Sequence, residues 1–234
     1  MEVNLGIDDA GRGPVIGPMV LAGCILKKED EKKLKRLGVK DSKQLTRKRR
    51  IFLVEKIKEV TEGYEIISIF PQEIDGEMAN GKEDNEKNKE KRIKLNELEA
   101  IACSKIINKL SQKYEKLNVF LDCPSISITK WDQFLRTQIT NASNLVISCE
   151  HKADKNHVSV SAASILAKER REEEMDKLKE KYGVEIGSGY TSDPTTKKFV
   201  TKYAQKYQKE GIFRKTWQTW KNAIAELTQR TLDV

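Results

Sequence analysis

Three segments of the sequence place aspartates where they could hold a divalent cation. Asp8 and Asp9 end an alternating apolar segment. Asp122 ends the segment VFLD, and Asp154 lies in EHKADKNHVSVSAAS. Clustered carboxylates repel one another unless a cation compensates their charge, and oxygen ligands suit Mg²⁺ or Mn²⁺. Two such ions about 3.5–4 Å apart can activate a water molecule and stabilise the leaving oxygen of a phosphodiester. This chemistry needs no histidine, and the chain has only two.

Each of these aspartates also has an ordinary structural interpretation, because an acid at a strand end commonly forms a turn or caps a helix. From the residues alone, three classes of protein remain open: a two-metal nuclease, an actin-like or sugar-kinase ATPase, and a nucleic-acid-binding module without catalysis. The ATPase class also places an acid and a glycine turn on its first strand. It needs a second glycine-rich phosphate loop, however, which we do not find in the sequence.

The composition favours a globular protein with a polyanionic partner. The 234 residues include 44 lysines and arginines against 36 acids, a net charge of +8. Such an excess fits nucleic acid, although a generally lysine-rich composition explains it equally well. Four widely spaced cysteines without a CxxC pair predict reduced thiols in a cytoplasmic protein. No apolar segment approaches the roughly 20 residues that a membrane-spanning helix needs.

The elements that would position the acids are strands alternating with helices. Strands are predicted over residues 3–7, 19–26, 64–70, 118–122 and 145–148. Helices are predicted over 40–60, 93–117, 131–139 and 161–182, with two more near the C-terminus. A charged turn is expected after residue 26 and a solvated loop over 81–92. This order predicts a mixed α/β sheet.

The site is expected at the carboxyl ends of the strands, where ligands bind in such sheets. If the strands that end in Asp8 and Asp122 are parallel neighbours, their carboxylates converge. Asp154 precedes a helix that starts with very small residues, including Ala162 and Ala163, which would let that helix pack close to the sheet.

Several segments together resemble one family. GIDDAGRGPVIGPMV, LGVKDSKQL, LNELEA, VFLDCP, EHKADKNHVSVSAASILAKERR, GSGYTSDP and RKTWQTW occur in the order seen in ribonuclease HII of the archaeal type, which is similar to the catalytic subunit of the eukaryotic enzyme. The resemblance covers nearly the whole chain. It implies a ribonuclease H-like fold, a five-stranded mixed sheet flanked by helices. The catalytic domain would span residues 1–194, and a helical extension would span 195–234.

The resemblance also implies an activity and its metal ligands. Enzymes of this family hydrolyse the RNA strand of RNA/DNA hybrids and cut on the 5′ side of ribonucleotides embedded in duplex DNA, leaving 3′-hydroxyl and 5′-phosphate ends. The family's catalytic, metal-binding acids fall on Asp8, Asp9, Asp122 and Asp154, which would hold two Mg²⁺ or Mn²⁺ ions in the substrate complex. The implied protein is a cytoplasmic monomer that acts in DNA replication and ribonucleotide excision repair.

The family's substrate-binding residues fall on a glycine turn and a tyrosine. Backbone amides of the turn Gly11-Arg12-Gly13 could bond the 2′-hydroxyl that distinguishes RNA from DNA. Arg12 would contact phosphate, and Tyr190 would sense the RNA–DNA junction by lying against the sugar that follows the ribonucleotide.

Other residues have weaker functional interpretations. Lys43 and Lys152 are candidate phosphate contacts, with simple surface charge as the alternative. The terminal residues QRTLDV resemble the start of a sliding-clamp-binding box, with Gln229 and Leu232 in place but without its final aromatic residues. A frayed chain end is the other interpretation. For Trp217 and Trp220 we predict packing rather than base stacking.

The second metal-binding position departs from the family pattern. The family motif is GIDEAGRG, whereas this chain reads GIDDAGRG, so that Asp9 is one methylene shorter than the usual glutamate. Because successive strand side chains point to opposite faces, the residue after Asp8 must reach around the strand to share an ion. Either the shorter side chain is natural variation with a shifted ion or bridging water, or it is a substitution that weakens catalysis.

We predict that Asp9→Glu increases Mg²⁺-dependent turnover by about tenfold, the size of effect that a perturbed metal site typically shows. The longer side chain would restore the reach that the family pattern provides. Steady-state cleavage of one RNA/DNA hybrid by both proteins measures the change, and an unaltered turnover would show that the shorter acid costs nothing.

Overall fold

The computed structural model describes residues 2–39, 45–79, 93–182 and 186–232. The chain divides into two compact units. The first comprises Met1–Ala10, Val20–Ile67 and Asn96–Arg170, and the second comprises Gly11–Met19, Ser68–Leu95 and Arg171–Val234.

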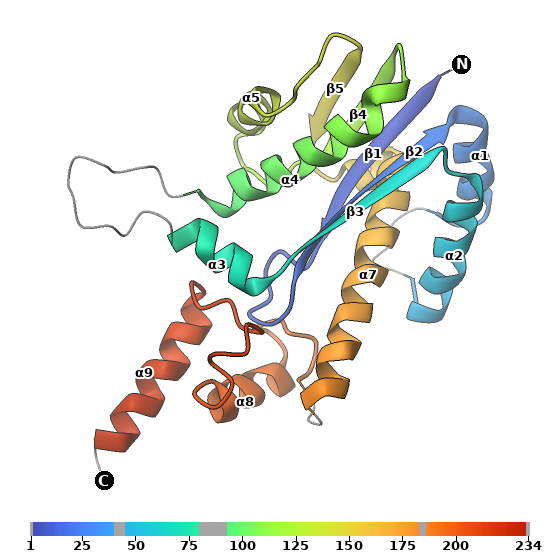
Figure 1. Cartoon of the computed structure of the whole chain (residues 1–234). Helices are drawn as coiled ribbons and strands as arrows, with labels where there is room; N and C mark the ends of the chain where they lie inside the picture. Colours follow the sequence, from blue (N-terminus) through green and yellow to red (C-terminus); the bar gives the residue numbers. More distant parts are fainter. Residues whose placement is uncertain (1, 40–44, 80–92, 183–185, 233–234) are drawn as a thin grey trace, which may run out of the picture. The chain divides into compact units, whose positions relative to one another are not determined.

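The first unit is built on a five-stranded mixed sheet (Figure 1). Its strands are β1 (Val3–Ala10), β2 (Met19–Lys27), β3 (Gly63–Ile69), β4 (Leu117–Asp122) and β5 (Leu145–Glu150). They lie in the order β3-β2-β1-β4-β5. β1 pairs with β2 antiparallel, whereas β1 with β4 and β4 with β5 are parallel. The five-stranded mixed sheet predicted from the sequence is therefore confirmed.

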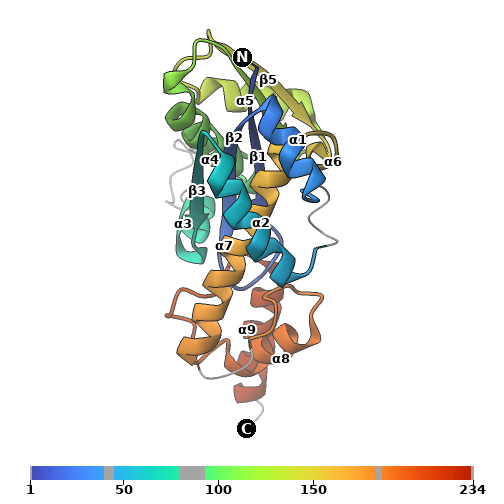
Figure 2. The same cartoon turned by 90° about the vertical axis from the view of Figure 1, so that its right-hand side faces the viewer.

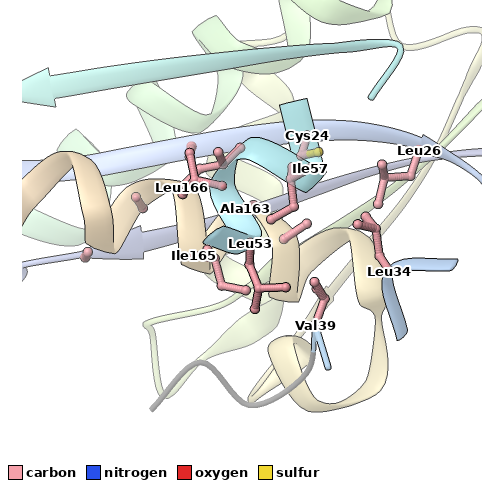
Figure 3. Close-up of a cluster of buried hydrophobic side chains, with 14 of the residues drawn as sticks. Cys24, Leu26, Leu34, Val39, Leu53, Ile57, Ala163, Ile165 and Leu166 are labelled. Carbon is pink, nitrogen blue, oxygen red and sulfur yellow. The ribbon is translucent and has the colours of Figure 1, made fainter. Parts of the chain in front are cut away.

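One face of this sheet is covered by α1 (Lys28–Arg36), α2 (Arg47–Val60) and the beginning of α7 (Val158–Tyr182). Alternate residues of β2 point to this face because strand side chains alternate. Figure 3 shows the resulting core, in which β2 contributes Cys24 and Leu26, α2 contributes Leu53 and Ile57, and α7 contributes Ala163, Ile165 and Leu166.

The opposite face is covered by α4 (Leu95–Leu110), and α5 (Ile128–Thr137) lies beside β5 (Figures 1 and 2). A Cβ atom added to Gly23 of β2 would overlap Ile106 of α4 and lie 3.3 Å from Leu110. The glycine thus lets α4 approach the sheet closely, and β2 is buried on both faces.

The beginning of α7 also packs directly on β1. A Cβ atom at Gly6 would overlap the backbone of Ser159 and Val160, so only glycine fits between the strand and the helix. Ser159, Ala162 and Ala163 are fully buried. The small residues that suggested close packing to the sheet therefore do pack there.

The second unit has its own apolar core. It contains α3 (Pro71–Ala79), α8 (Pro194–Tyr203), α9 (Gln218–Leu232) and the end of α7. Ile16 and Phe213 form an isolated β-bridge, and both lie in a core cluster with Met175, Phe199 and Trp220. The packing role predicted for Trp220 is confirmed by this burial.

Two predictions about the elements are wrong, and one lies outside the described residues. The expected charged turn after residue 26 is helix α1, whose single buried apolar residue is Leu34. The helix predicted over 93–117 ends at Leu110 and is followed by a 3₁₀ turn at Ser111–Lys113. The predicted loop over 81–92 lies outside the described residues, and the domain division after residue 194 stays a prediction. Among the described helices, none is long and apolar enough to cross a membrane.

Candidate active site

The pairing of β1 with β4 positions the first two acids. Ile7 of β1 lies opposite Leu121 of β4 in the parallel register. The next residues are Asp8 and Asp122, which therefore occupy the same edge of the sheet. The condition set from the sequence, that these two strands be parallel neighbours, is met.

The carboxyl of Asp8 is buried near the charges of Asp9 and Asp122. Its side chain is 7% exposed, and Oδ1 accepts a hydrogen bond of 2.8 Å from the backbone N–H of Asp9. Burial raises its pKa well above the usual value of 3.8, and the charges of Asp9 and Asp122 raise it further, against a hydrogen bond from Ser164. A cation at this position would offset both the burial and the repulsion.

Asp154 is placed by the turn that follows β5. Lys152 adopts a left-handed conformation with φ of 60°, after which the short helix α6 (Ala153–Asn156) begins. The backbone N–H of Ala153 donates to Oδ1 of Asp122 at 3.0 Å, which ties this turn to the end of β4. Asp154 itself is 4% exposed, and its backbone carbonyl accepts a hydrogen bond from Ser161.

Two histidines brace the same turn. His157 lies 3.0 Å from Glu150 through Nε2 and stacks on Phe120 with ring centroids 3.9 Å apart. Nδ1 of His151 lies 3.0 Å from the carbonyl oxygen of Cys123. Both contacts connect the residues around Asp154 to β4 and β5.

Asp9 points to the other face of the sheet from Asp8. Gly6 and Asp8 face α7, so alternation directs Asp9 toward α4. The thiol of Cys103 on α4 has its pKa raised by burial, then by the charges of Glu99 and Asp9. Glu99 is 2% exposed and was not recognised from the sequence as a site residue, although it lies in LNELEA. An acid within an apolar helical stripe is the signal that could have identified it.

The candidate oxygen donors fit a hard divalent cation in their chemistry. Within residues 2–39, 45–79, 93–182 and 186–232, no three His, Cys, Asp or Glu side chains are grouped as a metal site would group them. The chemistry still matches Mg²⁺ or Mn²⁺, because the candidate donors are carboxylates and Asp8 is buried where other acids oppose its ionisation.

The glycine turn belongs to the second unit. Gly11 is buried with φ of 79°, and a Cβ atom there would overlap the side chain of Arg171 and lie 2.7 Å from the carbonyl oxygen of Pro18. Arg12 is half-buried and Gly13 is exposed. Apart from Gly13 and its two chain neighbours, no heavy atom of the described residues lies within 4 Å of a Cβ position at Gly13.

Tyr190 lies in the same unit and is linked to the turn by its neighbours. Its ring is 39% exposed, which differs from a core tyrosine, and the guanidinium of Arg171 lies 4.9 Å from the ring centroid. The carbonyl of Gly189 accepts hydrogen bonds from the N–H groups of Val15 and Ile16 at 2.9 and 3.3 Å. Arg171, which sequence reasoning missed, therefore lies against both Gly11 and Tyr190.

Of the two candidate lysines, only Lys152 lies within the described residues. Lys152 is exposed at the start of α6, two residues before Asp154. Lys43 lies outside the described residues, so its predicted phosphate contact stays a prediction.

We predict that Asp8→Asn stabilises the metal-free protein at neutral pH by about 1 kcal/mol or more. The pKa of Asp8 is raised in the folded state, so the unfolded chain loses this proton first as the pH rises above 3.8, and unfolding becomes easier. The variant does not lose this stability as the pH rises. Its free energy of unfolding should therefore exceed that of the native protein at neutral pH and equal it near pH 4. Urea unfolding in EDTA at several pH values measures the difference.

Asp193→Asn is the matched control with the opposite sign. Hydrogen bonds from Ser188 and Thr195 lower the pKa of Asp193, so its contribution is present at neutral pH and is lost as the pH falls. If Asp8→Asn destabilises the metal-free protein at neutral pH, as Asp193→Asn should, the repulsion assigned to Asp8 is absent.

Comparisons with known proteins identify the family. The profile of the ribonuclease HII family matches residues 5–220. Ribonuclease HII of Methanococcus maripaludis strain C7 is 40% identical over 231 residues, which cover 97% of this chain and 90% of the relative.

Two solved structures are similar over almost their whole length. Ribonuclease H2 of Pyrococcus horikoshii has a TM-score of 0.79 at 35% identity, covering 94% of this chain and 96% of the other. Ribonuclease HII of Archaeoglobus fulgidus, solved in complex with PCNA, has a TM-score of 0.76 at 35% identity, covering 92% and 95%. The chain therefore belongs to the ribonuclease HII family, hydrolases that cleave the RNA of RNA/DNA hybrids.

Proposed function

We propose that this ribonuclease H also cuts on the 5′ side of single ribonucleotides embedded in duplex DNA, by two-metal-ion hydrolysis that leaves 3′-hydroxyl and 5′-phosphate ends. The observation that carries the proposal is the parallel pairing of β1 with β4, which brings Asp8 and Asp122 to one edge of the sheet. The hydrogen bond from Ala153 to Asp122 adds the turn that bears Asp154.

The proposed cofactors are Mg²⁺ or Mn²⁺, held by Asp8, Asp122 and Asp154 with Asp9 as a further ligand. When bound, such ions activate the attacking water and stabilise the leaving oxygen. The chain's own contribution is to keep these carboxylates at a fixed edge of the sheet. Burial of Asp8 and Asp154 limits their contact with bulk water and strengthens their attraction for a cation.

For the substrate, we assign recognition of the ribose to the turn Gly11-Arg12-Gly13. Gly13 is exposed and has open space beside it, as close approach of a sugar requires. The exposed ring of Tyr190 would lie against the next sugar, and Arg12 and Lys152 would contact phosphates. The net charge of +8 favours this polyanionic substrate.

A sliding clamp is a second proposed partner, because the Archaeoglobus relative was solved in complex with PCNA. The candidate segment is the C-terminal QRTLDV, in which Gln229 belongs to α9. We also propose a monomer acting in the cytoplasm in replication and repair, where the four free cysteines would stay reduced.

The decisive experiment is cleavage of a DNA duplex that contains one ribonucleotide, with Mg²⁺ or Mn²⁺ present. We expect cutting on the 5′ side of the ribonucleotide, and a loss of more than about 100-fold in Asp122→Asn with duplex binding retained. Asp132→Asn is the matched control, because Asp132 makes an ion pair with Arg136 at 2.8 Å on α5 and should leave cleavage unchanged.

Three outcomes would contradict the proposal. Duplex binding without any cleavage would favour a binding module, and ATP uptake without nucleic acid would favour a kinase-like protein. Equal cleavage by the native protein and Asp122→Asn would remove the acids from the mechanism.

A further inference from the structure

Arg214 is a buried arginine whose hydrogen bonds are directed at the glycine turn. Its side chain is 0% exposed. Nη2 donates to the carbonyl oxygen of Gly11 at 2.6 Å, and Nη1 donates to that of Arg12 at 2.7 Å. Nε and Nη2 both donate to the carbonyl oxygen of Gly17, at 3.1 and 2.9 Å. One guanidinium thus holds both ends of the segment from Gly11 to Gly17.

Trp217 completes this clamp. Its ring centroid lies 5.0 Å from the Arg214 guanidinium, and its Nε1–H donates to the carbonyl oxygen of Gly13 at 3.1 Å. The three consecutive carbonyls of the turn therefore all accept hydrogen bonds from two residues more than 200 positions away along the chain.

These contacts determine where the amide groups of the turn point. In a planar trans peptide, the N–H is antiparallel to the C=O of the preceding residue, and no cis peptide occurs among the described residues. Because the carbonyls of Gly11 and Arg12 point at Arg214, the N–H groups of Arg12 and Gly13 point away from it. The other two clamped carbonyls, of Gly13 and Gly17, precede prolines and carry no N–H.

We propose that Arg214 is a positioning residue for ribose recognition: it fixes the direction of the Arg12 and Gly13 amides, which donate to the 2′-hydroxyl oxygen. The inference rests on the proposed function of the glycine turn and adds the group that sets its specificity. Gly13 is exposed, and beyond its two chain neighbours the part of the chain that the structure describes places no heavy atom within 4 Å of a Cβ position there, so a sugar has room to approach.

The role requires arginine rather than any cation. Burying a charge is costly unless it is well hydrogen-bonded, and a planar fork of donors can reach several carbonyls at once. A lysine ammonium would keep the charge but lose the fork, so it could not hold the carbonyls of Gly11, Arg12 and Gly17 together. Arg214→Lys therefore separates the geometry of the clamp from its charge.

The test compares binding of two duplexes that differ by a single 2′-hydroxyl, with Asp122→Asn as the non-cleaving parent and Mg²⁺ present. The parent should prefer the ribonucleotide duplex. Adding Arg214→Lys should lower this preference at least tenfold, with affinity for the all-DNA duplex within twofold of the parent. Arg136→Lys is the control, since Arg136 also donates to a backbone carbonyl, that of Ile147 at 3.1 Å, on another element. It should keep the full preference.

Trp217→Phe provides a milder variant that keeps an aromatic ring beside the guanidinium and removes the N–H that bonds to the carbonyl oxygen of Gly13. We expect it to lower the ribose preference about threefold and to unfold cooperatively, so the proposal remains testable if Arg214→Lys does not fold. An unchanged preference in a folded Arg214→Lys protein, or in Trp217→Phe, overturns the positioning role. An equal loss of affinity for both duplexes overturns it too.

Binding by the Asp122→Asn parent distinguishes the positioning role of Arg214 from ribose recognition by the glycine turn. A parent that binds both duplexes equally would overturn ribose recognition by the turn, and the positioning role with it. A parent that discriminates, beside a folded Arg214→Lys variant that discriminates equally, would overturn the positioning role alone.

Discussion

The repulsion among carboxylates at the end of β1 is the constraint on which the functional account depends. Backbone hydrogen bonds fix β4 beside β1, and the register leaves Asp8 and Asp122 next to each other. Glycine at position 6 and small residues on α7 then bury Asp8 under the helix. At fixed register, this repulsion is relieved either by a proton, which the raised pKa of Asp8 favours, or by a bound cation. A divalent cation is the simplest partner that turns the unfavourable arrangement into a binding site.

In the second unit, the groups held in a fixed direction are the backbone carbonyls and amides of the glycine turn, whereas in the first unit they are carboxylate side chains. Gly11 adopts a conformation with positive φ, and its lack of a side chain leaves room for Arg171. Arg214 is fully buried, so its surroundings fix the position of its guanidinium. Carbonyls turned inward to a guanidinium leave the amides of the same peptides turned outward. A buried guanidinium therefore fixes the direction of the amides to which we assign ribose recognition.

Sequence reasoning predicted the elements that local patterns encode, and the roles of the site residues stay predictions. The apolar segments before Asp8 and Asp122 predicted β1 and β4, although β1 continues to Ala10, and the small residues after Asp154 indicated close packing on the sheet. The assignment of Gly11, Gly13 and Tyr190 to substrate binding came from the family motif and stays a prediction. Helix α1 was missed because nearly all of its residues are charged, and its one buried apolar side chain carries no periodicity.

The arginines and Glu99 were missed for a different physical reason. Nothing near position 214 shows that its partners are the carbonyls of residues 11, 12 and 17, because such contacts depend on the folded chain alone. Arg171 likewise looks like one charge in the run KERREEE, although its side chain is 5% exposed. Composition and periodicity do not encode the burial of these two arginines, whereas Glu99 could have been recognised as an acid within an apolar helical stripe.

The most direct test of the central claim is anomalous X-ray scattering from crystals soaked in Mn²⁺. The account predicts a manganese peak bound by carboxylate oxygens of Asp8, Asp122 and Asp154. Side chains that point apart, with no anomalous peak among them, would contradict it.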